Sequence, residues 1–364
     1  MDPETGQLIF GKRPHARRPV ASLTKLMTAL LVFEQTKPRE WVIVSEEAAP
    51  PRNLVGVSTL GLKSGERIRV EDLLYALLLQ SANDAAVALA EHVSGTSEAF
   101  EREMNTRAEA LGASDTEFLS PNGLDDDGYS SAADMARIAS AVLKAPKLRK
   151  IMQTKFYEIP APAGQPSREI QNRNVMLWLY PGTTGGKTGF TYDAGYCVVV
   201  SANRGEMSLL AVILGEKGEP FSEAASLLDW GFASLEEVTP VREGDPLGTR
   251  LIGGSEVEMT AGKTLTVLMP TRDVARVNLV TRLEGPDGPL AVGDVIGAVR
   301  VSGPSGPLGE VPLVVAAVSP AGSPSVAPSP TPLAGEDDEA PWWLRFLRAI
   351  WDAITGFFER IFGD

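Results

Sequence analysis

The stretch Ala21-Ser22-Leu23-Thr24-Lys25-Leu26 places a hydroxyl and an amine one helical turn apart at the start of an apolar segment. Apolar residues occupy almost every face from Ser22 to Thr36, which predicts a buried helix that ends before Pro38. Residues i and i+3 share one face of a helix, so the Lys25 amine can take the Ser22 proton once burial lowers its pKa. Taken alone, the pattern also fits a capping serine with a snorkelling lysine.

A second short motif, Ser81-Ala82-Asn83, falls between two helical patterns that together span Val70 to Val93. A turn at this point would expose the hydroxyl and the carboxamide to one cleft. Ser81 could relay a proton to a leaving amine, and Asn83 could hold the lysine amine and a substrate amide. The alternative is that Asn83 only caps the helix that follows.

The third motif, Gly186-Lys187-Thr188-Gly189, follows a glycine-rich turn and precedes an apolar strand. A phosphate-binding P-loop would need glycine where Pro181 stands, and it would need a helix after the motif, so this interpretation is disfavoured. At a strand edge, Lys187 and Thr188 would instead bind a carboxylate. The exposed backbone could then pair with a peptide substrate as an added strand.

The composition of the chain argues against several classes of function. The net charge of −13 over 364 residues argues against nucleic acid as a partner, because phosphate binding needs a clustered basic surface. The one cysteine, Cys197, lies in an apolar run and is expected to be a buried strand residue without a disulfide. The only histidines, His15 and His92, argue against a zinc peptidase site, and we expect neither in a Ser-His-Asp triad.

The chain divides by composition into four segments. Residues 1–235 predict an α/β fold, residues 236–318 a small β domain rich in glycine and proline, and residues 319–341 a disordered linker. Within the first segment we expect these elements: strands at 7–10, 155–160, 195–201 and 208–214, and helices at 22–36, 70–93, 98–111, 131–143 and 220–232.

The last segment, residues 342–364, carries an aromatic-rich apolar stripe at helical spacing. Charged residues such as Arg345 and Asp352 interrupt it, which argues against a spanning helix of roughly 20 apolar residues. The pattern is typical of an amphipathic helix that lies in a membrane surface and anchors the protein there. The alternative is a helix that docks onto the protein itself or onto a partner.

In chain order, Ser22-x-x-Lys25, Ser81-x-Asn83 and Lys187-Thr188-Gly189 resemble the signature of the penicillin-recognising serine acyltransferases. The resemblance narrows to the low-molecular-mass penicillin-binding proteins with D,D-carboxypeptidase activity, peptidase family S11. Further segments that carry it are 18–30, 120–125, 171–174 and 186–191. It covers roughly residues 3–235, and it implies a β-lactamase-like, transpeptidase-like fold with an antiparallel sheet flanked by helices. The small all-β domain and the C-terminal amphipathic helix match the family's usual layout.

The resemblance also implies a role for each motif residue. Ser22 would be acylated by the penultimate D-alanine of a peptidoglycan stem peptide ending in D-Ala-D-Ala, with Lys25 as general base. Ser81 and Asn83 would assist proton transfer and positioning. The substrate-binding strand would comprise Lys187, Thr188, Gly189, Phe190 and Thr191, with the N–H groups of Ser22 and Phe190 as the oxyanion hole. β-Lactam antibiotics would acylate the same serine. The family implies no metal and no cofactor, and it implies the extracytoplasmic face of the bacterial membrane.

The sequence departs from the family's pattern at two places, and it leaves two alternative functions open. Ala82 occupies a position where glycine is common in the family, and no signal peptide is visible after Met1, so we expect the natural product to be longer. A class A β-lactamase would need a deacylating glutamate, for which Glu101-x-x-Met104-Asn105 is the candidate stretch. The other rival is an inactive wall-binding scaffold of the same fold.

Overall fold

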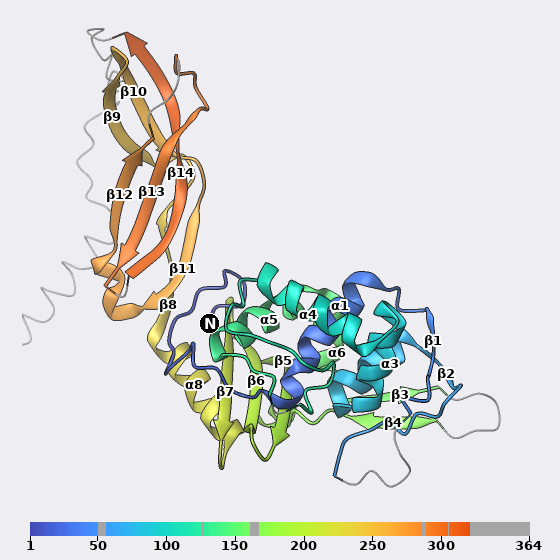
Figure 1. Cartoon of the computed structure of the whole chain (residues 1–364). Helices are drawn as coiled ribbons and strands as arrows, with labels where there is room; N and C mark the ends of the chain where they lie inside the picture. The colour runs from blue at the N-terminus through green and yellow to red at the C-terminus, as the bar shows by residue number, and fades with distance from the viewer. Residues whose placement is uncertain (50–55, 126, 161–166, 285–288, 305, 321–364) are drawn as a thin grey trace, which may run out of the picture.

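The computed structural model describes residues 1–49, 56–125, 127–160, 167–284, 289–304 and 306–320. These residues form a mixed helix-and-sheet lobe that carries an elongated β lobe at one end (Figure 1). The amphipathic helix expected at 342–364 lies outside the described residues. So does the expected linker at 319–341, except for its first two residues, which belong to the last strand.

A three-stranded antiparallel sheet of order β5-β6-β7 lies at the centre of the first lobe. Its strands are β5 (Thr183–Thr191), β6 (Gly195–Arg204) and β7 (Met207–Glu216). Successive side chains of a strand point to opposite faces. Accordingly, Cys197 and Val199 of β6 join the core beneath the helical layer, while Val198 and Val200 join the core beneath α8 (Pro220–Ser234). The fold class predicted for this region is confirmed, as is the burial of Cys197.

The helical layer covers the other face of this sheet (Figure 1). Its members are the 3₁₀ turn η1 (Ala21–Thr24), α1 (Lys25–Gln35), α2 (Val70–Tyr75), the π-helical turn η2 (Ala76–Gln80), α3 (Asn83–Ser94), α4 (Ser97–Ala110), α5 (Ala132–Lys144) and α6 (Pro146–Gln153). The short helix α7 (Met176–Leu179) packs on the α8 side of the sheet, since Met176 belongs to the same core cluster as Leu228 of α8. Two small hairpins flank it, β1 (Trp41–Ile43) with β2 (Arg67–Arg69), and β3 (Phe156–Ile159) with β4 (Arg168–Gln171). The central helix α1 contacts α3, α4 and α5 and buries most of its side chains, as its apolar sequence predicts.

The strand expected at residues 7–10 is wrong, because this segment has no regular structure. Its aromatic residue Phe10 stays half exposed and packs against Trp230 of α8, with 5.3 Å between the ring centroids. The sheet is extended instead by Met1, whose backbone nitrogen and oxygen both bond to Leu210 of β7, at 3.0 and 2.9 Å. A short apolar run after the Thr5-Gly6 turn therefore predicted a strand, where packing on α8 determines the conformation.

The second lobe is all-β. Its five-stranded antiparallel sheet has the order β12-β13-β14-β10-β9, and β8 pairs separately with β11. The strands are β8 (Leu235–Val241), β9 (Pro246–Ile252), β10 (Ser255–Ala261), β11 (Leu265–Pro270), β12 (Asn278–Leu283), β13 (Val295–Gly303) and β14 (Gly306–Pro320), with the 3₁₀ helix η3 (Thr271–Arg276) between β11 and β12. This lobe has a core of its own, built from Val257, Val299 and Leu313 among others. It begins directly after α8, close to the expected boundary at residue 235.

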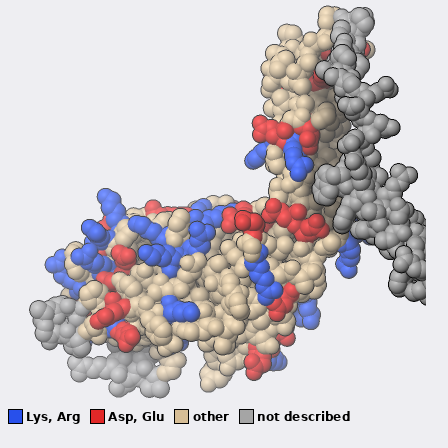
Figure 2. Space-filling view, turned by 180° about the vertical axis from the view of Figure 1, so that it is seen from behind, with Lys and Arg blue, Asp and Glu red and all other residues tan. Residues whose placement is uncertain are grey.

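The molecular surface mixes both signs of charge. Viewed from behind, basic and acidic side chains are interspersed over the first lobe, and acidic side chains gather near its junction with the β lobe (Figure 2). Among the described residues, no helix is both long and apolar enough to cross a membrane.

Candidate active site

The Ser22 segment is a 3₁₀ turn that runs directly into α1, where the sequence predicted one continuous α-helix. In a 3₁₀ turn, side chains at i and i+3 eclipse one another, which brings Lys25 over Ser22 more directly than an α-helix would. Ala21, the first residue of the turn, has a φ of 48°, an uncommon value for a residue with a side chain. The Lys25 amine lies 2.8 Å from Ser22 Oγ, and Ser22 itself is only partly buried. The predicted pair is therefore in contact at the edge of the core.

Three oxygen atoms surround the Lys25 amine. Besides Ser22 Oγ, they are Asn83 Oδ1 at 2.8 Å and the backbone oxygen of Asn122 at 2.5 Å. The last two can only accept hydrogen bonds, whereas a hydroxyl can accept or donate. A neutral amine would give its two N–H bonds to Asn83 and Asn122 and keep its lone pair for the Ser22 hydroxyl. The contact set therefore suits a general base.

The Lys25 pKa is well below its usual value. Burial is the largest cause, because the side chain is 0% exposed and a charged amine is poorly solvated there. The positive charges of Lys187 and Arg173 lower it further, while the negative charge of Asp84 raises it. Burial therefore shifts Lys25 toward the neutral amine, the form that a general base needs.

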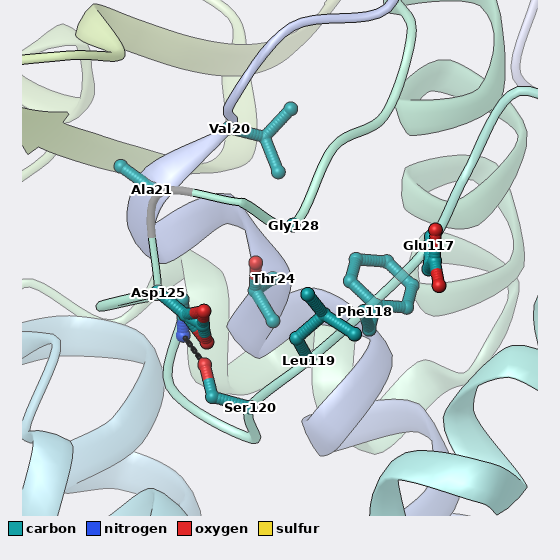
Figure 3. Close-up of a pocket in the computed structure, with 10 residues that line it drawn as sticks. Val20, Ala21, Thr24, Glu117, Phe118, Leu119, Ser120, Asp125 and Gly128 are labelled. Carbon is teal, nitrogen blue, oxygen red and sulfur yellow. Dashed lines mark hydrogen bonds between the residues drawn. The ribbon is translucent and has the colours of Figure 1, made fainter.

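The loop at residues 120–124 supplies one contact that the sequence argument missed. Thr28 of α1 donates a 2.6 Å bond to the Pro121 carbonyl, and Ser120 Oγ accepts one of 3.0 Å from the Gly123 N–H. Figure 3 shows this loop wrapping around the turn that begins α1, with the Ser120 bond drawn as a dashed line. The Pro-Asn-Gly run predicted a turn, but nothing in it indicated that the Asn122 carbonyl would face the lysine.

The second motif occupies the break between η2 and α3. Ser81 has φ 64° and ψ 35°, a left-handed conformation that ends the π-helical turn and redirects the chain. Asn83 is the first residue of α3, and its carboxamide points to Lys25 rather than capping the helix. The expectation of two helices separated by a turn at Ser81-Ala82-Asn83 is confirmed.

The third motif lies in the middle of β5, so its lysine projects from a strand. Lys187 Nζ donates to Ser81 Oγ at 2.9 Å and to the Thr188 carbonyl at 2.6 Å. Burial and the nearby Arg173 charge lower the pKa of Lys187 to about 7. The next element is the strand β6, which contradicts a P-loop at this position. Lys187 and Ser81 thus connect the second and third motifs.

Gly189 lets β5 pass against the Ser22 turn. A Cβ built on Gly189 would lie 2.9 Å from Ser22 N and 3.1 Å from Val20 O, so a larger residue would push the strand away. Phe190 follows with its ring half exposed and packed on Tyr196, 4.6 Å between centroids. Thr191 accepts a bond from the Ala194 N–H, which closes the hairpin to β6. In the described sheet, β5 pairs with β6 alone and leaves its other edge beside Ser22.

The residues of the rival interpretations lie elsewhere. Asn105 exchanges two 2.8 Å bonds with the backbone of Phe118, and Met104 is a core residue. Burial, more than the nearby Glu98 and Asp125 charges, raises the pKa of Glu101, and within the described part of the chain Glu101 makes no hydrogen bond to Ser22 or Lys25. The two histidines pair with surface carboxylates instead: His15 with Asp115 and His92 with Glu40.

Comparisons with known proteins give one consistent result. The family model described as D-alanyl-D-alanine carboxypeptidase matches residues 1–218. The D-alanyl-D-alanine carboxypeptidase DacC of Escherichia coli strain K12 is 34% identical over 319 residues, 82% of this chain and 78% of that protein. DacA of the same strain is 32% identical over 341 residues, 89% of this chain and 83% of that protein. The crystal structure of penicillin binding protein 5 from Haemophilus influenzae superposes with a TM-score of 0.73 at 30% identity, over 86% of this chain and 94% of that chain.

The solved structure matches both lobes, since its coverage reaches well beyond the first 218 residues. A family match over more than half of the 364 residues, with relatives of this similarity along most of their length, shows that the chain belongs to the D-alanyl-D-alanine carboxypeptidase family, peptidase family S11.

Proposed function

We propose that this chain removes the terminal D-alanine from peptidoglycan stem peptides through an acyl-enzyme on Ser22, with Lys25 as the general base. The observation that carries the proposal is the 2.8 Å contact between Lys25 Nζ and Ser22 Oγ in a setting where burial favours the neutral amine. An unassisted serine hydroxyl is a weak nucleophile, and a buried neutral amine at hydrogen-bond distance is the base it needs.

The proposed reaction proceeds in two stages. Lys25 takes the Ser22 proton while Oγ forms a bond to the carbonyl carbon of the penultimate D-alanine. The peptide C–N bond then breaks, and the leaving D-alanine amine takes up the proton that Lys25 removed from Ser22. Ser81 can pass on that proton, because its Oγ already accepts from Lys187 and keeps its own hydrogen free. Water then adds to the ester carbonyl, the bond from the acyl carbon to Ser22 Oγ breaks, and a proton from the water restores the serine hydroxyl as the shortened peptide leaves with a free carboxyl group.

Two further groups fit this substrate. The charge of Lys187 and the partly exposed Thr188 hydroxyl would hold the terminal carboxylate beside the β5 edge. The backbone N–H groups of Ser22 and Phe190 would receive the negative oxygen, which the close passage of Gly189 over Ser22 N supports. The free edge of β5 would pair with the peptide backbone ahead of the two D-alanines.

Covalent labelling by penicillin tests the nucleophile. Incubation with benzylpenicillin should raise the intact mass by one penicilloyl group, and peptide mapping should place that group on Ser22. The Ser22→Ala variant should remain unlabelled with an unchanged thermal unfolding curve. Labelling of Ser22→Ala would mean that another residue is the nucleophile. A folded wild-type protein that takes no label would favour the inactive scaffold.

Penicillin turnover separates a carboxypeptidase from a β-lactamase. In this structure Asn105 is engaged with the Phe118 backbone and Glu101 does not bond to Lys25, which supports slow hydrolysis of the acyl-enzyme. Rapid turnover that Glu101→Gln abolishes would instead support the β-lactamase.

We also propose the domain layout and location that the sequence indicated. Residues 1–235 would form the catalytic domain and 236–318 the β domain, with 342–364 binding a membrane surface on the extracytoplasmic side. Co-sedimentation with anionic phospholipid vesicles tests this location: the full chain should pellet with the vesicles, and a chain ending at residue 341 should stay in the supernatant with its peptidase activity retained. Equal sedimentation of both chains would contradict the proposal that residues 342–364 bind the membrane.

A further inference from the structure

The segment at residues 58–62 is attached by several hydrogen bonds to the end of η2 and the start of α3. Ser58 Oγ donates a 2.6 Å bond to the Gln80 carbonyl, and Gln80 Nε2 returns one of 2.9 Å to the Thr59 carbonyl. Both bonds join the segment to the turn that carries Ser81 and Asn83. The first two residues of the segment are therefore fixed against the residue that precedes the second motif.

Asp84 makes the strongest of these attachments. Its carboxylate accepts from the backbone N–H groups of three successive residues, Leu60, Gly61 and Leu62, at 2.9, 2.9 and 3.1 Å. The same carboxylate accepts from Ala85 N at 2.9 Å, within the first turn of α3. The Asp84 side chain is buried, and hydrogen bonds to a buried charged acceptor are about twice as strong as neutral ones.

The anchored segment ends at an oxygen that orients Asn83. The Ser58 carbonyl accepts two bonds from Asn83, 2.8 Å from its backbone N–H and 2.9 Å from Nδ2. A carboxamide whose Nδ2 is fixed in this way must present Oδ1 in the opposite direction, which is toward Lys25 Nζ at 2.8 Å. The orientation of the group that holds the lysine thus depends on where Ser58 lies.

We infer that Asp84 is a positioning residue for acylation: by holding residues 60–62 against α3, it fixes the Ser58 carbonyl that turns the Asn83 carboxamide toward Lys25. The inference rests on the proposed acylation of Ser22 and adds to it a residue that touches neither substrate nor nucleophile.

The test compares Asp84→Asn with Asp134→Asn in the full chain. Asp134 is a matched control, since it is also buried in the first turn of a helix and also accepts a backbone N–H from a preceding loop, that of Asp115 at 2.7 Å. The measured quantities are the rate constant and the apparent dissociation constant for acylation by a fluorescent penicillin. Asp84→Asn should lower the rate constant about 10- to 100-fold, the factor expected for bonds to a charged group, with the dissociation constant unchanged. Asp134→Asn should change neither.

A double-mutant comparison shows whether Asp84 acts through Asn83. In an Asn83→Ala background, adding Asp84→Asn should lower the acylation rate constant by less than about 2-fold, because the carboxamide that Asp84 helps to orient is already absent. Ser58→Ala, which removes the bond to Gln80 and keeps the carbonyl, should lower the same rate constant by about 2- to 10-fold and covers the case in which Asp84→Asn does not fold. The inference would be overturned if the double variant lost the full product of the two single-variant decreases in the acylation rate constant. Equal rate constants for Asp84→Asn and Asp134→Asn would also overturn it. An unlabelled wild-type protein would overturn the proposed function instead.

Discussion

Lys25 and Asn122 lie 97 residues apart in sequence, yet the lysine amine donates a 2.5 Å hydrogen bond to the asparagine's backbone carbonyl. The loop can approach this closely only because glycine follows. A Cβ on Gly123 would lie 2.1 Å from the Ala21 carbonyl oxygen and 2.6 Å from Thr24 Oγ1, far inside contact distance. In the proposed mechanism the neutral amine uses this carbonyl as one of its two acceptors, so a single glycine links the loop to the proposed base Lys25.

Gly123→Ala should therefore lower both stability and acylation rate. Gly112→Ala is the matched control, because both glycines have nearly the same φ, 72° and 71°, while a Cβ at Gly112 meets nothing within 4 Å. In both variants the positive φ should lower the free energy of unfolding by about 1 kcal/mol or more. The additional decrease in Gly123→Ala therefore measures the effect of displacing the loop. Thermal unfolding and penicillin acylation rates are the measurements. Equal behaviour of the two variants would contradict a role for the close approach.

Much of the site could be predicted because it is encoded in side chains. Ser22 and Lys25 are three residues apart within one apolar run, so local periodicity alone predicts that they meet. The Lys187 to Ser81 contact joins residues 106 positions apart; the order of the motifs indicated that both belong to one site, but not that they touch. Asn122 contributes a peptide oxygen, which every residue has, so its role carried no sequence signal. The left-handed Ser81 was hidden in the same way, since φ at a serine is set by the packing around it.

The wrong strand prediction at residues 7–10 also shows that a local sequence pattern does not reveal which tertiary contacts a segment will make. The apolar run Leu8-Ile9-Phe10 suits a strand, but a segment this short cannot pair without an available strand edge. At the β7 edge, Leu210 is already bonded to Met1. Tertiary contacts, with Phe10 on Trp230, decide the conformation instead.

Lys25→Met should keep the fold and remove the proposed general base. Methionine has a similar length and suits a buried position, but it cannot accept a proton. The rate constant for penicillin acylation should fall by about 10²- to 10⁴-fold, the usual contribution of a placed general base. The apparent dissociation constant should change little, because Lys187 and Thr188 remain. A variant that acylates at the wild-type rate would assign the base to another group.

The pH dependence of substrate affinity should report Lys187. Its pKa is lowered to about 7, so its charge is present below that pH and is lost as the pH rises through it. KM for a peptide ending in D-Ala-D-Ala should therefore increase from pH 7 to pH 9. The same peptide with a C-terminal amide lacks the carboxylate, and its KM should stay flat. An equal rise for both peptides would show that Lys187 does not bind the carboxylate.

The same residue should make the folded state less stable at neutral pH than at alkaline pH. The folded pKa of Lys187 is about 7 and its ordinary value is 10.5, so between these limits the unfolded chain binds more protons than the folded one. The free energy of unfolding must then rise with pH across this window, by at most about 1.4 kcal/mol per pH unit for one group, and this stability is lost as the pH falls toward 7. Lys187→Met should remove this part of the slope in urea unfolding measured at pH 7, 8.5 and 10. Replacing the exposed Lys147 of α6 by methionine should leave the slope unchanged. A Lys187→Met slope equal to that of the wild type would mean that the buried amine keeps its proton in the folded state throughout this range.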